Sequence, residues 1–122
     1  MKLLTKEVQK NLPSLYSQEG VTDAVVRLKM FNPCGAATWY ITEGSPVDEN
    51  GTYVLGENGV KVEYNPAVHS DFLFFGLCDL GYGGELGYVS LSELQSLRLP
   101  FGLGIERDLH FLPAPLSKFS RE

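Results

Sequence analysis

Residues 72–78 form the longest mostly apolar run of the chain, Phe-Leu-Phe-Phe-Gly-Leu-Cys, without alternating polar residues. A short apolar run of this kind predicts a strand that is covered on both faces. Gly81, Gly83 and Gly84 predict a hairpin turn, after which residues 85–89 return as an antiparallel partner. We therefore expect this strand to lie at the centre of the sheet. The run is much too short to cross a bilayer, so no membrane contact is expected.

Two short helices are predicted from their capping residues. Thr5 can accept a hydrogen bond from a backbone amide of the first turn and begin a helix, which ends before Pro13 because residues preceding proline avoid the helical region. Ser90 and Glu93 have the spacing of a capping box, which predicts a second helix that ends near Leu97.

Alternating side chains predict a second pair of strands. Residues 24–31 alternate in the manner of a half-buried strand, and residues 38–42 continue with side chains that favour strands, so a hairpin is expected. Residues 105–112 are expected to be a short extended or turn segment. Pro113 and Pro115 predict no regular structure after it.

Residues 44–70 differ from the rest of the chain in composition, because turn-forming residues are frequent there. Asn-Gly pairs at Asn50 and Asn58 mark turns, and short β-like pieces lie at residues 52–55 and 60–64. An exposed β-hairpin or loop excursion is expected here.

These elements together predict an α+β fold. The 122 residues suffice for a single domain, residues 1–122, with 44–70 as an inserted excursion. About four to five antiparallel strands are expected, with a few short helices packed on one face of the sheet.

The charge balance bears on partners. The chain carries 10 Lys and Arg against 15 Asp and Glu, a formal charge of −5. Binding nucleic acid requires a basic cluster, and the nearest approach to one is the dilute set Lys2, Lys6 and Lys10. Direct nucleic-acid binding is therefore not expected, and a protein partner with a basic surface is favoured.

The two cysteines, Cys34 and Cys78, lie far apart without the CxxC spacing of zinc or redox sites. No cofactor or metal is expected. The N-terminal residues lack the apolar stretch of a signal peptide, so a cytoplasmic location is expected.

Two sets of polar residues are candidates for chemistry. Glu106, Asp108 and His110 alternate, so on an extended segment they would share one face as an acid–base or ligand-binding cluster. The commoner alternative for such residues is structural: Glu106 and Asp108 pair with Arg107 or cap nearby backbone, and His110 packs under the proline-containing tail. Glu43 and Glu85 lie at predicted strand ends, where two carboxylates could converge and raise each other's pKa, although solvated glutamates are commoner there.

The aromatic residues offer a binding surface instead of a catalytic one. An exposed aromatic side chain on a sheet can anchor a protein partner, and Trp39 and Tyr53 are the candidates. With the neighbouring acidic side chains, the residues expected to bind a partner are Trp39, Glu43, Tyr53, Glu57 and Glu85. No catalytic residue is assigned, because nucleophile elbows and glycine-rich cofactor fingerprints are missing from the sequence.

Six ordered motifs resemble a known family. They lie at residues 3–7, 12–16, 38–43, 75–77, 85–94 and 105–113. Together the motifs are similar to those of a bacterial domain-of-unknown-function family common on plasmids, integrated elements and phages. The resemblance spans nearly the whole chain outside residues 44–70. It implies a mobile-element setting, and with it the roles of conjugation accessory, regulator or inhibitor of host defence.

Two functional hypotheses follow. The first is a small acidic interaction protein of a mobile genetic element that binds and modulates another protein, for example by inhibiting a host defence complex. The second is a small enzyme or ligand-binding protein that uses the carboxylate and histidine cluster. Either could act as a monomer or a homodimer.

Overall fold

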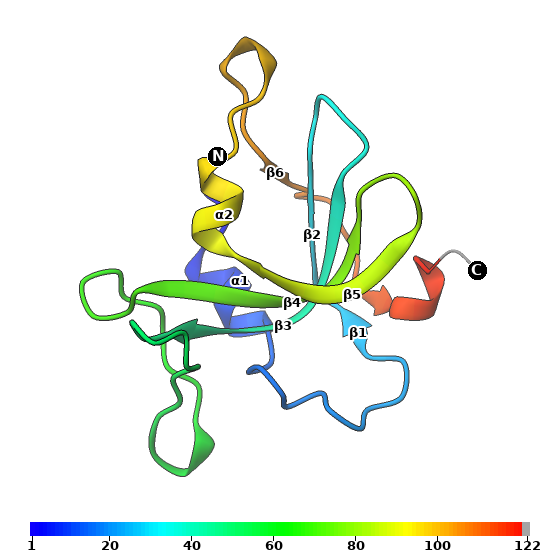
Figure 1. Cartoon of the computed structure of the whole chain (residues 1–122). Helices are drawn as coiled ribbons and strands as arrows, with labels where there is room; N and C mark the ends of the chain where they lie inside the picture. The colour runs from blue at the N-terminus through cyan, green and yellow to red at the C-terminus, as the bar shows by residue number, and fades with distance from the viewer. Residues whose placement is uncertain (121–122) are drawn as a thin grey trace.

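The computed structural model describes residues 1–120 and confirms the α+β class, with short helices beside antiparallel sheets (Figure 1). The regular elements are α1 (Lys6–Asn11), β1 (Val25–Val26), β2 (Leu28–Phe31), β3 (Thr38–Val47), η1 (Glu57–Gly59), β4 (Asp71–Asp79), β5 (Gly84–Ser90), α2 (Leu91–Ser96), η2 (Pro100–Gly102), β6 (Glu106–Arg107), β7 (Ala114–Pro115) and η3 (Leu116–Lys118).

The main sheet has five strands in the order β5-β4-β3-β2-β6, and β1 pairs separately with β7. All pairings are antiparallel, and β2 with β3 and β4 with β5 form neighbouring pairs, as the sequence predicts. Gly81 and Gly83 have φ values of +107° and +101° in the turn between β4 and β5. Glycine adopts such angles without the strain that a side chain would cause.

Both predicted helix caps are present. The Thr5 hydroxyl accepts a hydrogen bond from the Val8 amide at 3.1 Å at the start of α1. At the start of α2, Ser90 and Glu93 form the reciprocal capping box.

The centre of the sheet is β3, not the apolar strand β4, which lies between β3 and β5. The prediction that β4 is covered on both faces is also wrong, because Phe72 and Phe74 are buried whereas Leu73 and Phe75 are only half-buried. The strand carries one mostly buried face and one partly open face.

The strand β3 continues to Val47, so residues 44–47 belong to the sheet and the expected start of the excursion at Gly44 is wrong. A Cβ at Gly44 would lie 2.6 Å from the Phe72 ring. Glycine is used here for close packing of that ring against the strand, and not for a turn.

One face of the sheet carries the core. Trp39, Ile41, Phe72, Phe74 and Val89 lie on this face and form one cluster with apolar residues of the N-terminal segment and α2. The added residues include Leu3, Leu4, Leu12, Leu91 and Leu94. Both helices therefore cover the same cluster.

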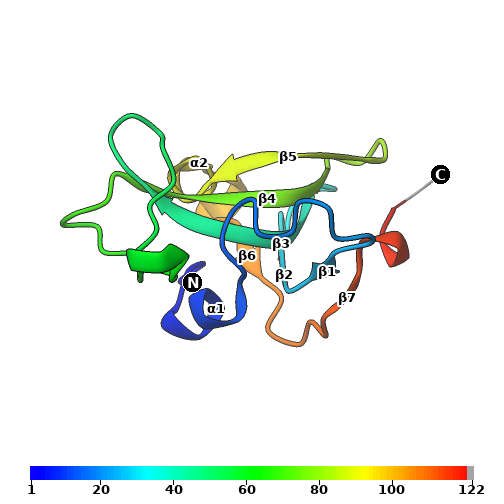
Figure 2. The ribbon, with the colours of Figure 1, turned by 90° about the horizontal axis from the view of Figure 1, so that it is seen from below.

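Residues 48–70 are called the arm below, and their segment 61–64 lies against α1 (Figure 2). Lys61 Nζ donates to the backbone carbonyls of Gln9, Lys10 and Leu12 at 2.9–3.0 Å, and the Tyr64 amide donates to Gln9 Oε1 at 2.7 Å. The arm contains the single turn η1 and an isolated bridge from Tyr53 to Val47, so of the two expected alternatives, a β-hairpin or a loop excursion, it corresponds to the loop. It is a loop attached to the helix.

The C-terminal tail is more regular than its prolines suggest. β6 adds to the sheet edge beside β2, and β7 pairs with β1 at a proline. The expectation of irregular structure after Pro113 is wrong, because an edge position of this kind does not require the missing proline amide.

Candidate functional site

The face of the sheet opposite the core is crossed by the loop of residues 12–24. The Leu15 amide donates to the buried Ser45 Oγ at 2.9 Å, and the Gly44 amide donates to the Pro13 carbonyl at 2.9 Å. These two bonds hold the loop against β3.

A β-bulge in β3 directs Glu43 towards this second face. In the ladder with β4, Ile41 pairs with Gly76 and Glu43 pairs with Phe75, so Thr42 is an extra residue. Side chains alternate along a strand, and without the bulge Glu43 would share the core face with Ile41. The Thr42 hydroxyl donates to the Phe75 carbonyl at 3.2 Å and stabilises the bulge.

Aromatic rings from three segments surround Glu43. Phe75 is paired with Glu43 on one side and with Tyr88 of β5 on the other, and the Phe75 and Tyr88 ring centroids are 4.9 Å apart. Tyr16 lies 6.4 Å from Tyr88 and 5.0 Å from Tyr53 of the arm. Neighbouring rings are tilted by 52–57° to each other, so they are not stacked in parallel.

These groups form a pocket of about 240 Å³. Its lining residues are Leu15, Tyr16, Gln18, Glu19, Glu43, Phe75 and Tyr88, and we call it the tyrosine pocket. A volume below that of drug-sized ligand sites suits one side-chain end or a small molecule.

Glu43 is the buried polar group of the tyrosine pocket. Its side chain is 5% exposed, and within residues 1–120 its Oε2 is buried without a hydrogen-bond partner. Burial raises the pKa of the Glu43 carboxyl, the backbone amides of Tyr16 and Gln18 oppose that rise, and the nearby Glu19 charge adds to it. An ionised carboxylate in this setting lacks the partner that buried charges normally have.

Tyr16 has a strained backbone. Its φ of +68° lies in the left-handed region, which a bulky residue rarely occupies. Strain of this kind persists only where surrounding structure holds it, and it concentrates at binding and catalytic sites.

The hydroxyls of Tyr16 and Tyr88 interact across the pocket. Their hydrogen bond, with smaller contributions from burial and from the Tyr16, Glu43 and Glu19 charges, raises the pKa of Tyr88 to about 12. Tyr88 therefore stays neutral at physiological pH. The pocket combines neutral aromatic rings with an acidic floor, a combination that attracts organic cations.

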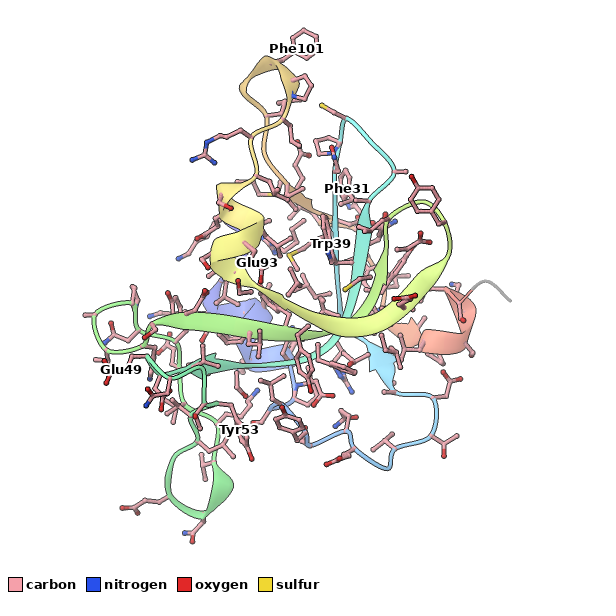
Figure 3. The ribbon with its side chains drawn as sticks, in the orientation of Figure 1. Phe31, Trp39, Glu49, Tyr53, Glu93 and Phe101 are labelled. Carbon is pink, nitrogen blue, oxygen red and sulfur yellow. The ribbon has the colours of Figure 1, made fainter. Side chains whose placement is uncertain are left out.

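The residues expected to bind a partner lie in different places. Glu43 lines the tyrosine pocket. Tyr53, which is labelled in Figure 3, contacts the ring of Tyr16 at the same pocket. Trp39 is 7% exposed and packs in the core, so the expectation that it is an exposed anchor is wrong. Glu57 is exposed in the arm, and Glu85 is exposed at the start of β5.

Glu43 and Glu85 do not converge. Glu85 pairs with Cys78, three residues along β4 from the Phe75 that pairs with Glu43, and it lies on the opposite face of the sheet. The bulge at Thr42 separates the faces of the two carboxylates.

Glu106, Asp108 and His110 do line one shallow hollow beside Lys29. Asp108 Oδ2 lies 3.8 Å from Lys29 Nζ, and Asp108 Oδ1 accepts a hydrogen bond from the His110 amide at 3.0 Å. Asp108 thus has the ion-pair and capping roles considered as the alternative to chemistry. Within residues 1–120, no three His, Cys, Asp or Glu side chains are grouped so that they could hold a metal ion.

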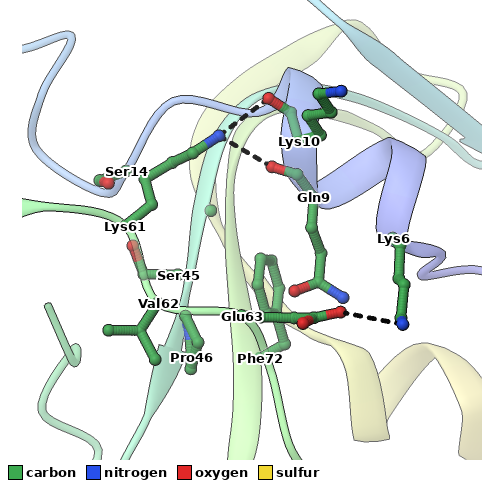
Figure 4. A pocket seen from close by; sticks show the side chains of 11 residues that line it. Lys6, Gln9, Lys10, Ser14, Ser45, Pro46, Lys61, Val62, Glu63 and Phe72 are labelled. Atoms are coloured by element: carbon green, nitrogen blue, oxygen red, sulfur yellow. Dashed lines mark hydrogen bonds and ion pairs between the residues drawn. The ribbon is translucent and has the colours of Figure 1, made fainter. Parts of the chain in front are cut away.

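A second pocket lies between the arm and α1 (Figure 4). Its volume is also about 240 Å³, and Lys6, Lys61, Glu63 and Phe72 are among its lining residues. The Lys61 ammonium is satisfied by three backbone carbonyls, and Lys6 Nζ lies 4.0 Å from Glu63 Oε1. Lys61, Lys6 and Glu63 of this pocket therefore already have partners, in contrast to Oε2 of Glu43.

Tyr16, Phe75 and Tyr88 were not candidates from the sequence. Glu43 could be identified as a candidate because it directly follows the strand-like residues 38–42. The aromatic residues around it come from distant segments of the chain and could not be identified in this way.

Among residues 1–120, no helix is long and apolar enough to span a membrane.

Comparison with known proteins gives a family. No curated protein and no solved structure matches the chain. The model of a family described as a protein of unknown function, DUF2958, matches residues 62–122, the second half of the chain. That half contributes Phe75 and Tyr88 to the tyrosine pocket, whereas Tyr16 and Glu43 precede it. The chain therefore belongs to the DUF2958 family, whose function is unknown.

Proposed function

We propose that this protein binds a basic protein partner and takes one of the partner's cationic side chains in the tyrosine pocket. Glu43 carries the proposal, because its Oε2 is buried without a hydrogen-bond partner within residues 1–120. A cation that enters the pocket would supply the missing partner, and an ion pair of this kind is strong where water is excluded.

The overall charge supports the same partner class. A formal charge of −5 attracts basic proteins over a distance of several ångströms and repels nucleic acid. Tyr16, Tyr53 and Tyr88 are 46%, 38% and 49% exposed, so their rings are available to a partner. Tyrosine is a frequent anchor at protein interfaces.

The biological setting forms the second part of the proposal. The six motifs resemble a family common on plasmids, integrated elements and phages, and a binding protein of such an element would act by modulating a host protein. Inhibition of a host defence complex is the role that we propose. A small enzyme built on Glu106, Asp108 and His110 is less supported, because Asp108 is engaged by Lys29 and by the His110 amide.

A titration followed by nuclear magnetic resonance tests the binding step. The ¹⁵N-labelled full chain is titrated with acetyl-Gly-Lys-Gly-amide and with its norleucine counterpart. We expect the lysine peptide alone to shift the amides of residues 15–19, 43, 75 and 88. Glu43→Gln should weaken binding about tenfold or more, the effect of losing a charged hydrogen bond.

Glu85→Gln is the matched control. It removes the same charge from an exposed glutamate on the other face of the sheet and should leave peptide binding unchanged. Equal weakening by both variants would mean that net charge, and not the tyrosine pocket, binds the peptide.

Phage plating tests the inhibitory role. Bacterial strains that each carry one defence system are made to express the wild-type chain, E43Q or E85Q. We expect the wild type and E85Q to restore plating on at least one strain and E43Q to fail. Unchanged plating on every strain would contradict the inhibitory role while leaving peptide binding intact.

A further inference from the structure

The walls of the tyrosine pocket are better suited to a cation with few hydrogen-bond donors than to a bare ammonium. The ring of Tyr88 is tilted by 57° to that of Phe75 and by 52° to that of Tyr16. The face of an aromatic ring attracts a positive charge without accepting a conventional hydrogen bond, and cages of such rings hold alkylated ammonium groups.

The acceptors inside the pocket are few. Tyr16 and Tyr88 are hydrogen-bonded to each other, and the backbone amides of Tyr16 and Gln18 approach the Glu43 carboxylate. Within residues 1–120, Glu43 Oε2 is the buried oxygen of this pocket without a partner. Glu19 lies at the exposed rim, where water competes for its oxygens.

A lysine ammonium carries three donors, so its entry would leave donors unsatisfied beside the rings. A dimethylated ammonium carries one donor, which matches the single buried Oε2, and its methyl groups contact the rings. A trimethylated ammonium has no donor for the carboxylate.

From this match we infer that the tyrosine pocket recognises an N,N-dialkylated ammonium group, presented as a dimethyl-lysine side chain of the protein partner. The inference rests on the proposed function, since it specifies which cation the same pocket takes. The pocket volume of about 240 Å³ admits the end of one such side chain and not a folded segment.

The test compares four forms of one peptide. Acetyl-Gly-Lys-Gly-amide with an unmodified, monomethylated, dimethylated or trimethylated lysine is titrated into the full chain. We expect the dimethylated form to bind about tenfold more tightly than the unmodified one, because the latter leaves donors unpaired. The trimethylated form should bind more weakly than the dimethylated one.

Variants assign any preference to the pocket. E43Q should abolish the preference for the dimethylated peptide, and E85Q should retain it. Tyr88→Leu is the second variant, because it removes a half-exposed ring, keeps the carboxylate and should also abolish the preference. Circular dichroism of each variant establishes that it is folded.

The other outcomes separate the two proposals. If the unmodified peptide binds as tightly as the dimethylated one, the inference is overturned and the proposed function stands. If no form of the peptide shifts the pocket amides, both fail. If free N,N-dimethylethylamine binds as tightly as the dimethylated peptide, the pocket takes a small amine and the protein source is overturned.

Discussion

The two faces of the five-stranded sheet are closed in different ways. On the core face, Phe74 and Ile41 are completely buried under apolar residues of the N-terminal segment and α2. On the second face, Glu43 and Ser45 are also buried, but they are polar and are covered by a loop that hydrogen bonds hold in place. Polar groups covered in this manner cost stability unless they are satisfied. The core face therefore contributes most of the folding stability, whereas the second face carries the tyrosine pocket.

The largest expected difference between the faces comes from a pair of adjacent phenylalanines. Phe74→Ala on the core face should lower the free energy of unfolding by about 3–5 kcal/mol, because it leaves a cavity in a closed core. Phe75→Ala on the second face should cost about half as much or less, since its ring is only half-buried. Urea denaturation of both variants measures the two values, and equal losses would contradict the distinction between the faces.

The features predicted from the sequence are the local ones. Thr5, Ser90 and Glu93 cap helices through residues three positions apart, and the glycine turn joins adjacent strands. The bulge at Thr42 was not predictable in this way, because it exists only in the pairing of β3 with β4. The tyrosine pocket was not predictable either, because its lining residues come from separate segments near residues 16, 43, 75 and 88.

The contacts of the arm were also not predictable from local sequence patterns. The Asn-Gly pairs predict the turns of the arm. The contact between the arm and α1, however, depends on hydrogen bonds from Lys61 to backbone carbonyls about fifty residues earlier in the chain. Nothing in the local pattern distinguishes a lysine that caps a distant helix end from a solvated one. Glu43 and Tyr53 were identified as candidates, and their spatial partners were not.

The hydrogen bond from the Leu15 amide to Ser45 Oγ holds the loop against the second face of the sheet. Ser45→Ala removes the acceptor of the Leu15 amide and leaves that amide buried and unsatisfied. We expect a loss of about 1–3 kcal/mol in unfolding free energy and faster hydrogen exchange at Leu15.

Ser17→Ala on the same loop is the control for Ser45→Ala. Its hydroxyl bonds to the Ser14 carbonyl at an exposed position, so a change within about 0.5 kcal/mol is expected. If Ser17→Ala matches the loss of Ser45→Ala, the loop is held by general packing and not by this bond.

The third prediction separates binding from stability at Tyr16. Asparagine tolerates the left-handed region better than tyrosine, so Tyr16→Asn should relieve backbone strain while losing ring contacts with Tyr53 and Tyr88. We expect the unfolding free energy to change by about 1 kcal/mol or less, and cation binding to be lost. A variant that unfolds more readily by about 3 kcal/mol would show that the ring is chiefly structural.

The smallest expected effect is the pH dependence contributed by Glu43. Its folded pKa is raised above the ordinary value of 4.5, mainly by burial. The folded state therefore holds this proton more tightly than the unfolded state does. The contribution is fully present below the unfolded pKa and is lost as the pH rises through the folded pKa. The stability difference between wild type and E43Q should fall over that window and level off above it.

Cation binding should have the opposite slope, because it requires the ionised carboxylate and so strengthens over the same window. Ile41→Val on the core face is the control. It should lower the unfolding free energy by about 0.5–1.5 kcal/mol at every pH without altering either slope. If binding and stability instead change in the same direction, Glu43 is not the group that meets the cation. Opposite slopes would assign both effects to one carboxylate, whose Oε2 has no hydrogen-bond partner in the free protein and gains a cation in the complex.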